Sequence, residues 1–148
     1  MRSWWSSLTG TTPLEKDNKV PGSHLKALEK LLGKAEVHLL SYVGSWKRQG
    51  QVMHDMYSTL PQWKLDEMAS IATCWEKTGV EGKCAIAYDW GCQAVFDDAH
   101  DIPRECKAWG LEVYGVQKPG LWGMGGLSKE ERFDSFPEAV DAYLKRHK

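Results

Sequence analysis

The chain has 148 residues, of which 42% are hydrophobic and 26% are charged, and its formal net charge is −1 at pH 7. This composition is typical of a globular protein, and the length predicts one domain with an ordinary core. The lysines and arginines form no dense stripe, and no apolar run reaches the roughly 18 residues of a membrane span, so we expect no nucleic-acid partner and no membrane insertion.

The N-terminal 21 residues are predicted to form an arm, and residues 22–148 are predicted to form a single helical domain. The arm is rich in Ser, Thr, Gly, Pro and charged residues and has no sustained periodicity. Its first ten residues lack the apolar centre of a secretory signal peptide. We therefore expect synthesis in the cytoplasm.

The first predicted helix begins after a plausible N-cap, Ser23. Two glycines, Gly33 and Gly44, each weaken this helix by about 1 kcal/mol relative to alanine, so a break into two helices is open. The helix is expected because apolar residues recur at steps of three and four, which is typical of one helical face: Leu25, Leu28, Leu32, Ala35, Leu39, Val43 and Trp46. Residues 52–60 predict a further short helix before Pro61.

Two more helices are predicted in the middle of the chain, over residues 62–79 and 83–99. Their apolar residues again follow helical spacing, and Asp97 and Asp98 are expected to face solvent. Residues 103–109 predict a short turn or helix. These segments would supply most of a helical core.

The C-terminal third of the chain combines a glycine-rich stretch with a capped helix. Residues 110–128 are predicted to form a loop or a small β-hairpin, with Val113, Tyr114 and Val116 as the strand-like part. Ser135 and Glu138 form a capping-box pattern that opens the last helix. The predicted fold class is therefore mainly α: one compact domain of five to six helices, with a Gly-rich loop or small β-hairpin before the C-terminal helix.

The cysteines and histidines favour no metal site and no cofactor. Cys74, Cys84, Cys92 and Cys106 form no C-x-x-C pair, and the five histidines show no paired ligand spacing. A mixed site with His100 is a formal alternative. Two disulfides and buried free thiols both remain open from the sequence.

Carboxylates near predicted loops are the remaining candidates for catalysis. Glu76 stands at the end of a predicted helix, and a glutamate against aromatic surface has a raised pKa that suits a general acid. Glu81, Glu112 and Asp89 are rival carboxylates. The alternative interpretation of Glu76 is a solvated residue at a helix end.

The order of features from residue 68 to residue 144 resembles the bacterial glucosaminidase family of peptidoglycan hydrolases. The resemblance lies in Glu76-Lys-Thr-Gly79, Val113-Tyr-Gly-Val116, Trp122-Gly123 and the helix opened by Phe133-Asp-Ser-Phe136. It implies a lysozyme-like α-rich fold that hydrolyses the peptidoglycan glycan, with Glu76 as the general acid. Tyr114 and Gly115 would line the sugar cleft, with Trp75 and Trp122 as further substrate-binding residues. A phage-encoded lysis enzyme would suit this interpretation.

The main alternative is a non-enzymatic protein that binds another protein. The chain has eight tryptophans, and exposed tryptophans act as buried anchors in partner pockets. A virion component, an inhibitor or an immunity-type factor would use them in this way. A thiol- or metal-dependent small protein is a third interpretation.

Overall fold

The computed structural model describes residues 22–43, 49–51, 53–54, 66–99, 101–117 and 126–148. The predicted arm over residues 1–21 and most of the helix predicted over residues 52–60 lie outside these ranges. Within the described chain, helices and strands are mixed along the sequence and every strand pair is parallel. No helix among the described residues is long and apolar enough to cross a membrane.

The strands form two small parallel sheets. In the first sheet, β1 (His38–Tyr42) pairs with β2 (Ser70–Cys74), and Leu40 lies opposite Ala72. The second sheet has the order β3-β4-β5, built from β3 (Ala94–Asp97), β4 (Glu112–Val116) and the short β5 (Arg132–Phe133). Parallel neighbours need crossover connections, and the connection from β3 to β4 runs through the helix Asp101–Ala108.

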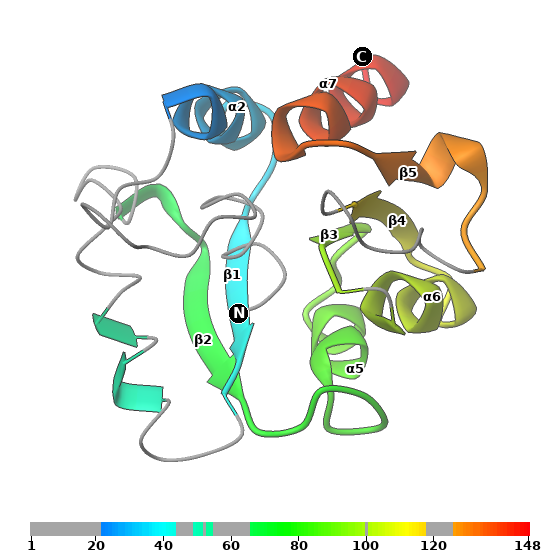
Figure 1. Ribbon diagram of the computed structural model, residues 1–148. Helices are drawn as coiled ribbons and strands as arrows, with labels where there is room; N and C mark the ends of the chain where they lie inside the picture. Colours follow the sequence, from blue (N-terminus) through cyan, green and yellow to red (C-terminus); the bar gives the residue numbers. More distant parts are fainter. Residues whose placement is uncertain (1–21, 44–48, 52, 55–65, 100, 118–125) are drawn as a thin grey trace.

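The helices lie in two layers, one on each side of the strands. The helices α2 (Gly22–Leu32) and α7 (Phe136–Arg146) lie against each other at the top of Figure 1, above the strands. The helices α5 (Lys83–Asp89) and α6 (Asp101–Ala108) lie on the other side, and the short 3-10 helix η1 (Lys129–Glu131) precedes β5. The architecture is therefore a three-layer α/β arrangement.

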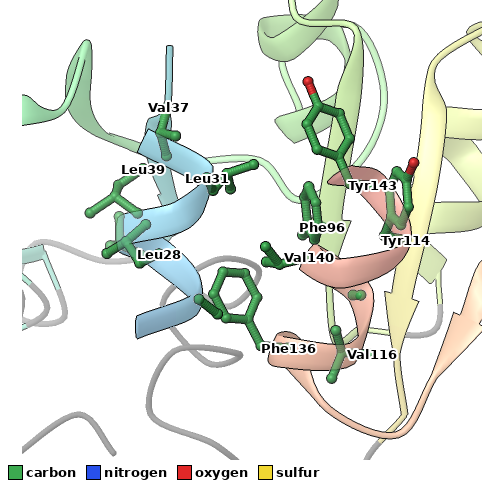
Figure 2. Close-up of a cluster of buried hydrophobic side chains, with 13 residues drawn as sticks. Leu28, Leu31, Val37, Leu39, Phe96, Tyr114, Val116, Phe136, Val140 and Tyr143 are labelled. Atoms are coloured by element: carbon green, nitrogen blue, oxygen red, sulfur yellow. The ribbon is translucent and has the colours of Figure 1, made fainter. Parts of the chain in front are cut away.

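Two hydrophobic clusters follow from the alternation of side chains along β3 and β4. Phe96 and Tyr114 point toward α2 and α7 and stack on each other with ring centroids 4.7 Å apart, in the cluster shown in Figure 2. Their neighbours Val95 and Val113 belong to the second cluster, with Ile102 of α6. Successive side chains of a strand face opposite sides of its sheet, so each face receives its own apolar set.

The predicted mainly-α fold class is wrong, because three of the predicted helices contain strands. The helix expected from Ser23 ends at Leu32, and the chain continues as β1; residues 70–74 form β2, and residues 94–97 form β3. The molecule is an α/β mixture with two parallel sheets. The spacing of apolar residues is compatible with a helix and with a buried parallel strand. Parallel strands that are covered on both faces have near-continuous apolar runs, and such runs also contain apolar residues at helical spacing.

The predictions for the C-terminal third are partly confirmed. The helix α6 covers most of residues 103–109, and the Ser135 hydroxyl caps α7 by accepting the N–H of Glu138 at 3.3 Å. The Glu138 carboxylate accepts the N–H of Asp134 rather than that of Ser135. The predicted hairpin strand exists as β4, but it pairs in parallel with β3 and β5.

One disulfide joins the helices α5 and α6. Cys84 of α5 is bonded to Cys106 of α6, and both residues are fully buried. Cys74 and Cys92 are free thiols. The structure therefore combines the two alternatives that the sequence left open.

Candidate functional site

Four polar or charged residues are buried among the described residues: Ser41, Lys83, Asp97 and Asp98. Ser41 lies in β1, Lys83 is the first residue of α5, Asp97 is the last residue of β3, and Asp98 follows it. Lysine and aspartate are rarely buried without partners. Their position at the ends of strands and at the start of a helix therefore marks a candidate site.

Lys83 and Asp97 form an ion pair inside the protein. The Lys83 Nζ lies 3.4 Å from Asp97 Oδ2, and the two side chains are 4% and 0% exposed. The other carboxylate oxygen, Asp97 Oδ1, accepts the N–H of Ala99 at 2.8 Å, which fixes its orientation. Burial lowers the pKa of Lys83, and the charges of Asp97, Cys74 and Asp98 oppose this effect.

The carboxyl ends of both sheets meet near Lys83. Cys74, the last residue of β2, lies within electrostatic range of Lys83, as does Asp97 at the end of β3. Burial raises the pKa of the Cys74 thiol, so this group is neutral at pH 7. In open parallel sheets, ligands bind in the crevice outside the carboxyl ends of the strands.

A tight turn before α5 holds Lys83 in place. A Cβ atom on Gly82 would lie 2.5 Å from the carbonyl carbon of Thr78, so the backbone of the turn passes directly against this glycine. The N–H of Gly79 donates to Glu105 of α6 at 2.9 Å, and Lys77 forms an ion pair with Asp101 at 3.2 Å. The turn is therefore tied to α6 from outside while Lys83 points inward.

A pocket of about 320 Å³ opens beside the ion pair and is lined by residues of both layers and both sheets. Lys83 and Asp97 line one part of it, and His38 and Trp90 line another. The His38 and Trp90 rings stack with centroids 5.0 Å apart, and His38 Nδ1 lies 2.7 Å from the hydroxyl oxygen of Ser70. The volume of the pocket is at the lower end of the range for small-molecule sites.

The residues predicted to form a sugar cleft are not brought together. Trp75 and Glu76 are exposed after the end of β2. Tyr114 and Gly115 are buried inside β4 of the other sheet, where the Tyr114 hydroxyl donates to Glu112. Trp122 lies outside the described residues. Cleavage of peptidoglycan by Glu76 stays a prediction, and no described contact of these residues supports it.

Tyr114 is packed in the hydrophobic core. Burial is the largest cause that raises its pKa, and its hydrogen bond to Glu112 acts in the same direction. Its ring stacks on Phe96 and Phe133. The aromatic-glycine pair that the resemblance placed in a cleft is thus part of the core.

The four buried polar residues were missed because the strands around them were interpreted as helices. Asp97 and Asp98 directly follow the apolar run Ala94-Val95-Phe96, which is a signal for carboxylates at the end of a buried strand. Lys83 follows a glycine, and its sequence neighbours do not distinguish it from a surface lysine. No set of three or more His, Cys, Asp or Glu side chains among the described residues could hold a metal ion alone.

No family model, no curated protein and no solved structure matches this chain.

Proposed function

We propose that this protein binds a phosphate-bearing small molecule, together with a divalent cation such as Mg²⁺, at the carboxyl edge of its two sheets. The observation that carries this proposal is the buried Lys83–Asp97 ion pair, which lines the pocket at the carboxyl end of β3. Structural ion pairs also occur in protein interiors, but this pair borders a cavity that is open to a ligand.

The balance of charge at the site supports a divalent cation. With both carboxylates ionised, one positive charge on Lys83 stands against two negative charges on Asp97 and Asp98. A phosphate alone would be repelled by this excess of negative charge. A bound divalent cation reverses the sign and allows a phosphate to approach.

The residues suit Mg²⁺ better than a metal held by protein ligands alone. Mg²⁺ is usually bound through one or two carboxylates, with waters and substrate phosphate oxygens as its other ligands. Asp97 lines the pocket and provides one such carboxylate, and Asp98 is the next residue in the chain and is buried.

Lys83, which lines the pocket, would contact the phosphate itself. A lysine ammonium binds phosphate as a point charge with rotatable donors. Burial lowers the pKa of Lys83. A bound phosphate dianion would favour the protonated form of this lysine.

Isothermal titration with inorganic phosphate, in the presence and absence of MgCl₂, tests this function. We expect binding only with Mg²⁺, and loss of binding in Lys83→Met. Because Lys83→Met leaves buried carboxylates without compensation, Asp98→Asn serves as a second variant that keeps the Lys83–Asp97 pair. It should weaken Mg²⁺-dependent binding by about tenfold or more, as expected for a lost metal ligand.

The matched control is Lys107→Met, which removes a lysine from an exposed ion pair with Glu131 on the outer side of α6. This variant should bind phosphate as the wild type does. A folded wild type that binds neither Mg²⁺ nor phosphate would contradict the proposal. Binding that survives in both site variants would show that the phosphate lies elsewhere.

A further inference from the structure

We infer that the ligand of this pocket carries a planar aromatic ring as well as a phosphate, as a nucleoside monophosphate does, and that the ring packs on Trp90. This inference rests on the proposed function, because Lys83 fixes the phosphate end of the ligand. It adds the chemical class of the rest of the ligand.

The pocket extends along the strands away from the ion pair. It is lined by all four residues of β3, from Ala94 to Asp97. Three residue steps along a strand correspond to about 10 Å. Lys83 and Asp97 stand at the carboxyl end of this length, and Trp90, Cys92 and Gln93 stand next to its amino end. A ligand that fills the pocket therefore needs a phosphate and a second group about one nucleoside length away.

The amino end of the pocket presents an aromatic side chain that the core does not cover. Trp90 lines the pocket and remains 38% exposed. Its backbone N–H donates to the carbonyl of Ile86 at the end of α5, so its main chain is held by the helix. An aromatic face on a rigid element is a stacking platform for a base.

The neighbours of Trp90 favour a polar ring over a plain hydrocarbon. His38 stacks on Trp90 and is oriented by Ser70, which leaves its Nε2 nitrogen as a second hydrogen-bonding atom. Gln93 and Glu36 line the same pocket and are exposed. Amide, carboxylate and imidazole groups around an aromatic face are the groups that recognise the edges of a nucleobase.

Titration of three probes in the presence of Mg²⁺ tests the inference: inorganic phosphate, ribose 5-phosphate and AMP. We expect AMP to bind about tenfold or more tightly than ribose 5-phosphate, because only AMP adds a stacked base. Trp90→Ala should remove this difference between AMP and ribose 5-phosphate. Trp109→Ala is the matched control, because Trp109 packs on Tyr88 outside the pocket lining and its loss should not alter the preference.

The outcomes separate the inference from the proposed function. Equal affinity for AMP and ribose 5-phosphate would overturn the aromatic ligand while phosphate binding stands. A preference for AMP that survives in Trp90→Ala would overturn the role of Trp90. If none of the three probes binds, the phosphate site and the inference both fail.

Discussion

At the scale of single residues, the Lys83–Asp97 pair should show strong coupling in stability. Removing one partner of a buried ion pair leaves an uncompensated charge and typically costs about 3–5 kcal/mol. We expect Lys83→Met and Asp97→Asn each to lower the free energy of unfolding in urea. The double variant should cost less than the sum of the two by about 1 kcal/mol or more.

The Lys107–Glu131 pair is the reference for this cycle, since its side chains are 46% and 20% exposed. Exposed pairs contribute between about 0 and 1 kcal/mol. If the losses in unfolding free energy from the Lys83 and Asp97 substitutions are additive, the two charges do not stabilise each other. The ion pair would then not support a candidate site at this position.

Gly82 is the second residue with a specific expectation. Its added Cβ in Gly82→Ala would meet the main chain of Thr78, which cannot move as a side chain does. We expect a loss of about 1–3 kcal/mol in unfolding free energy, as for other overpacked positions. The shifted turn should also weaken phosphate binding through Lys83. Gly22→Ala is the control, because nothing lies within 4 Å of its added Cβ; an equal loss there would refute the steric account.

At this scale the sequence predicted individual caps but not the site. The Ser135 cap of α7 could be predicted because a capping pattern is local and spans four residues. The meeting of Lys83 with Asp97 joins residues that are 14 positions apart through a helix and a crossover. Neither residue type nor spacing specifies such a contact until the register of the strands is known.

At the scale of secondary-structure elements, the Cys84–Cys106 disulfide joins α5 to α6 across 22 positions. Closing a loop of this length in the unfolded chain corresponds to about 3 kcal/mol of stability. We expect dithiothreitol to lower the urea midpoint of the wild type. The Cys84→Ala/Cys106→Ala variant should be less stable and insensitive to dithiothreitol. The urea midpoint of the wild type is measured after dithiothreitol treatment and after alkylation has shown that Cys84 and Cys106 are reduced. An unchanged midpoint in that sample would contradict a stabilising contribution of the disulfide.

The contact between α2 and α7 should make stability depend on pH through His24. Its ring stacks on Phe136 with centroids 6.0 Å apart, and burial lowers the pKa of His24 below 6.5. The unfolded state therefore takes up a proton at a higher pH than the folded state does. Stability from this group is present above pH 6.5 and is lost as the pH falls from 6.5 toward the lowered value.

Urea unfolding at pH 7.5 and pH 5.5 measures this effect. The decrease in stability between the two values should be smaller in His24→Gln than in the wild type. An identical decrease in His24→Gln would exclude His24 as the source.

The lengths of the elements explain why the sequence predicted the last helix but not the fold class. An apolar residue every three or four positions in an 11-residue helix such as α7 is a strong signal. The strands β1 to β4 have only four or five residues and apolar side chains on both faces. Short apolar runs of this kind are equally compatible with a helix segment. The helical spacing of apolar residues in the neighbouring helices continues into these runs, so the strands were interpreted as parts of the helices.

At the scale of the whole molecule, the two sheets should unfold together because one hydrophobic cluster contacts both. This cluster includes Leu39 of β1 and Phe96 of β3, with α2 and α7 covering them in Figure 2. Phe96 is 1% exposed and packs edge-on against Phe136 and Tyr143. A core residue in this position links the sheets in one cooperative unit.

Amide hydrogen exchange of Phe96→Ala measures this cooperativity. Truncating a buried phenylalanine costs about 3–5 kcal/mol. The Val43 N–H bonds to Cys74 in the first sheet, and the Glu112 N–H bonds to the carbonyl of Gln93 beside the second sheet. If the sheets form one unit, the exchange of both amides should accelerate by a similar factor, because both exchange through global unfolding. Acceleration of Glu112 alone would show that the sheets open independently. Tyr88→Ala, which removes an exposed ring, should accelerate neither amide.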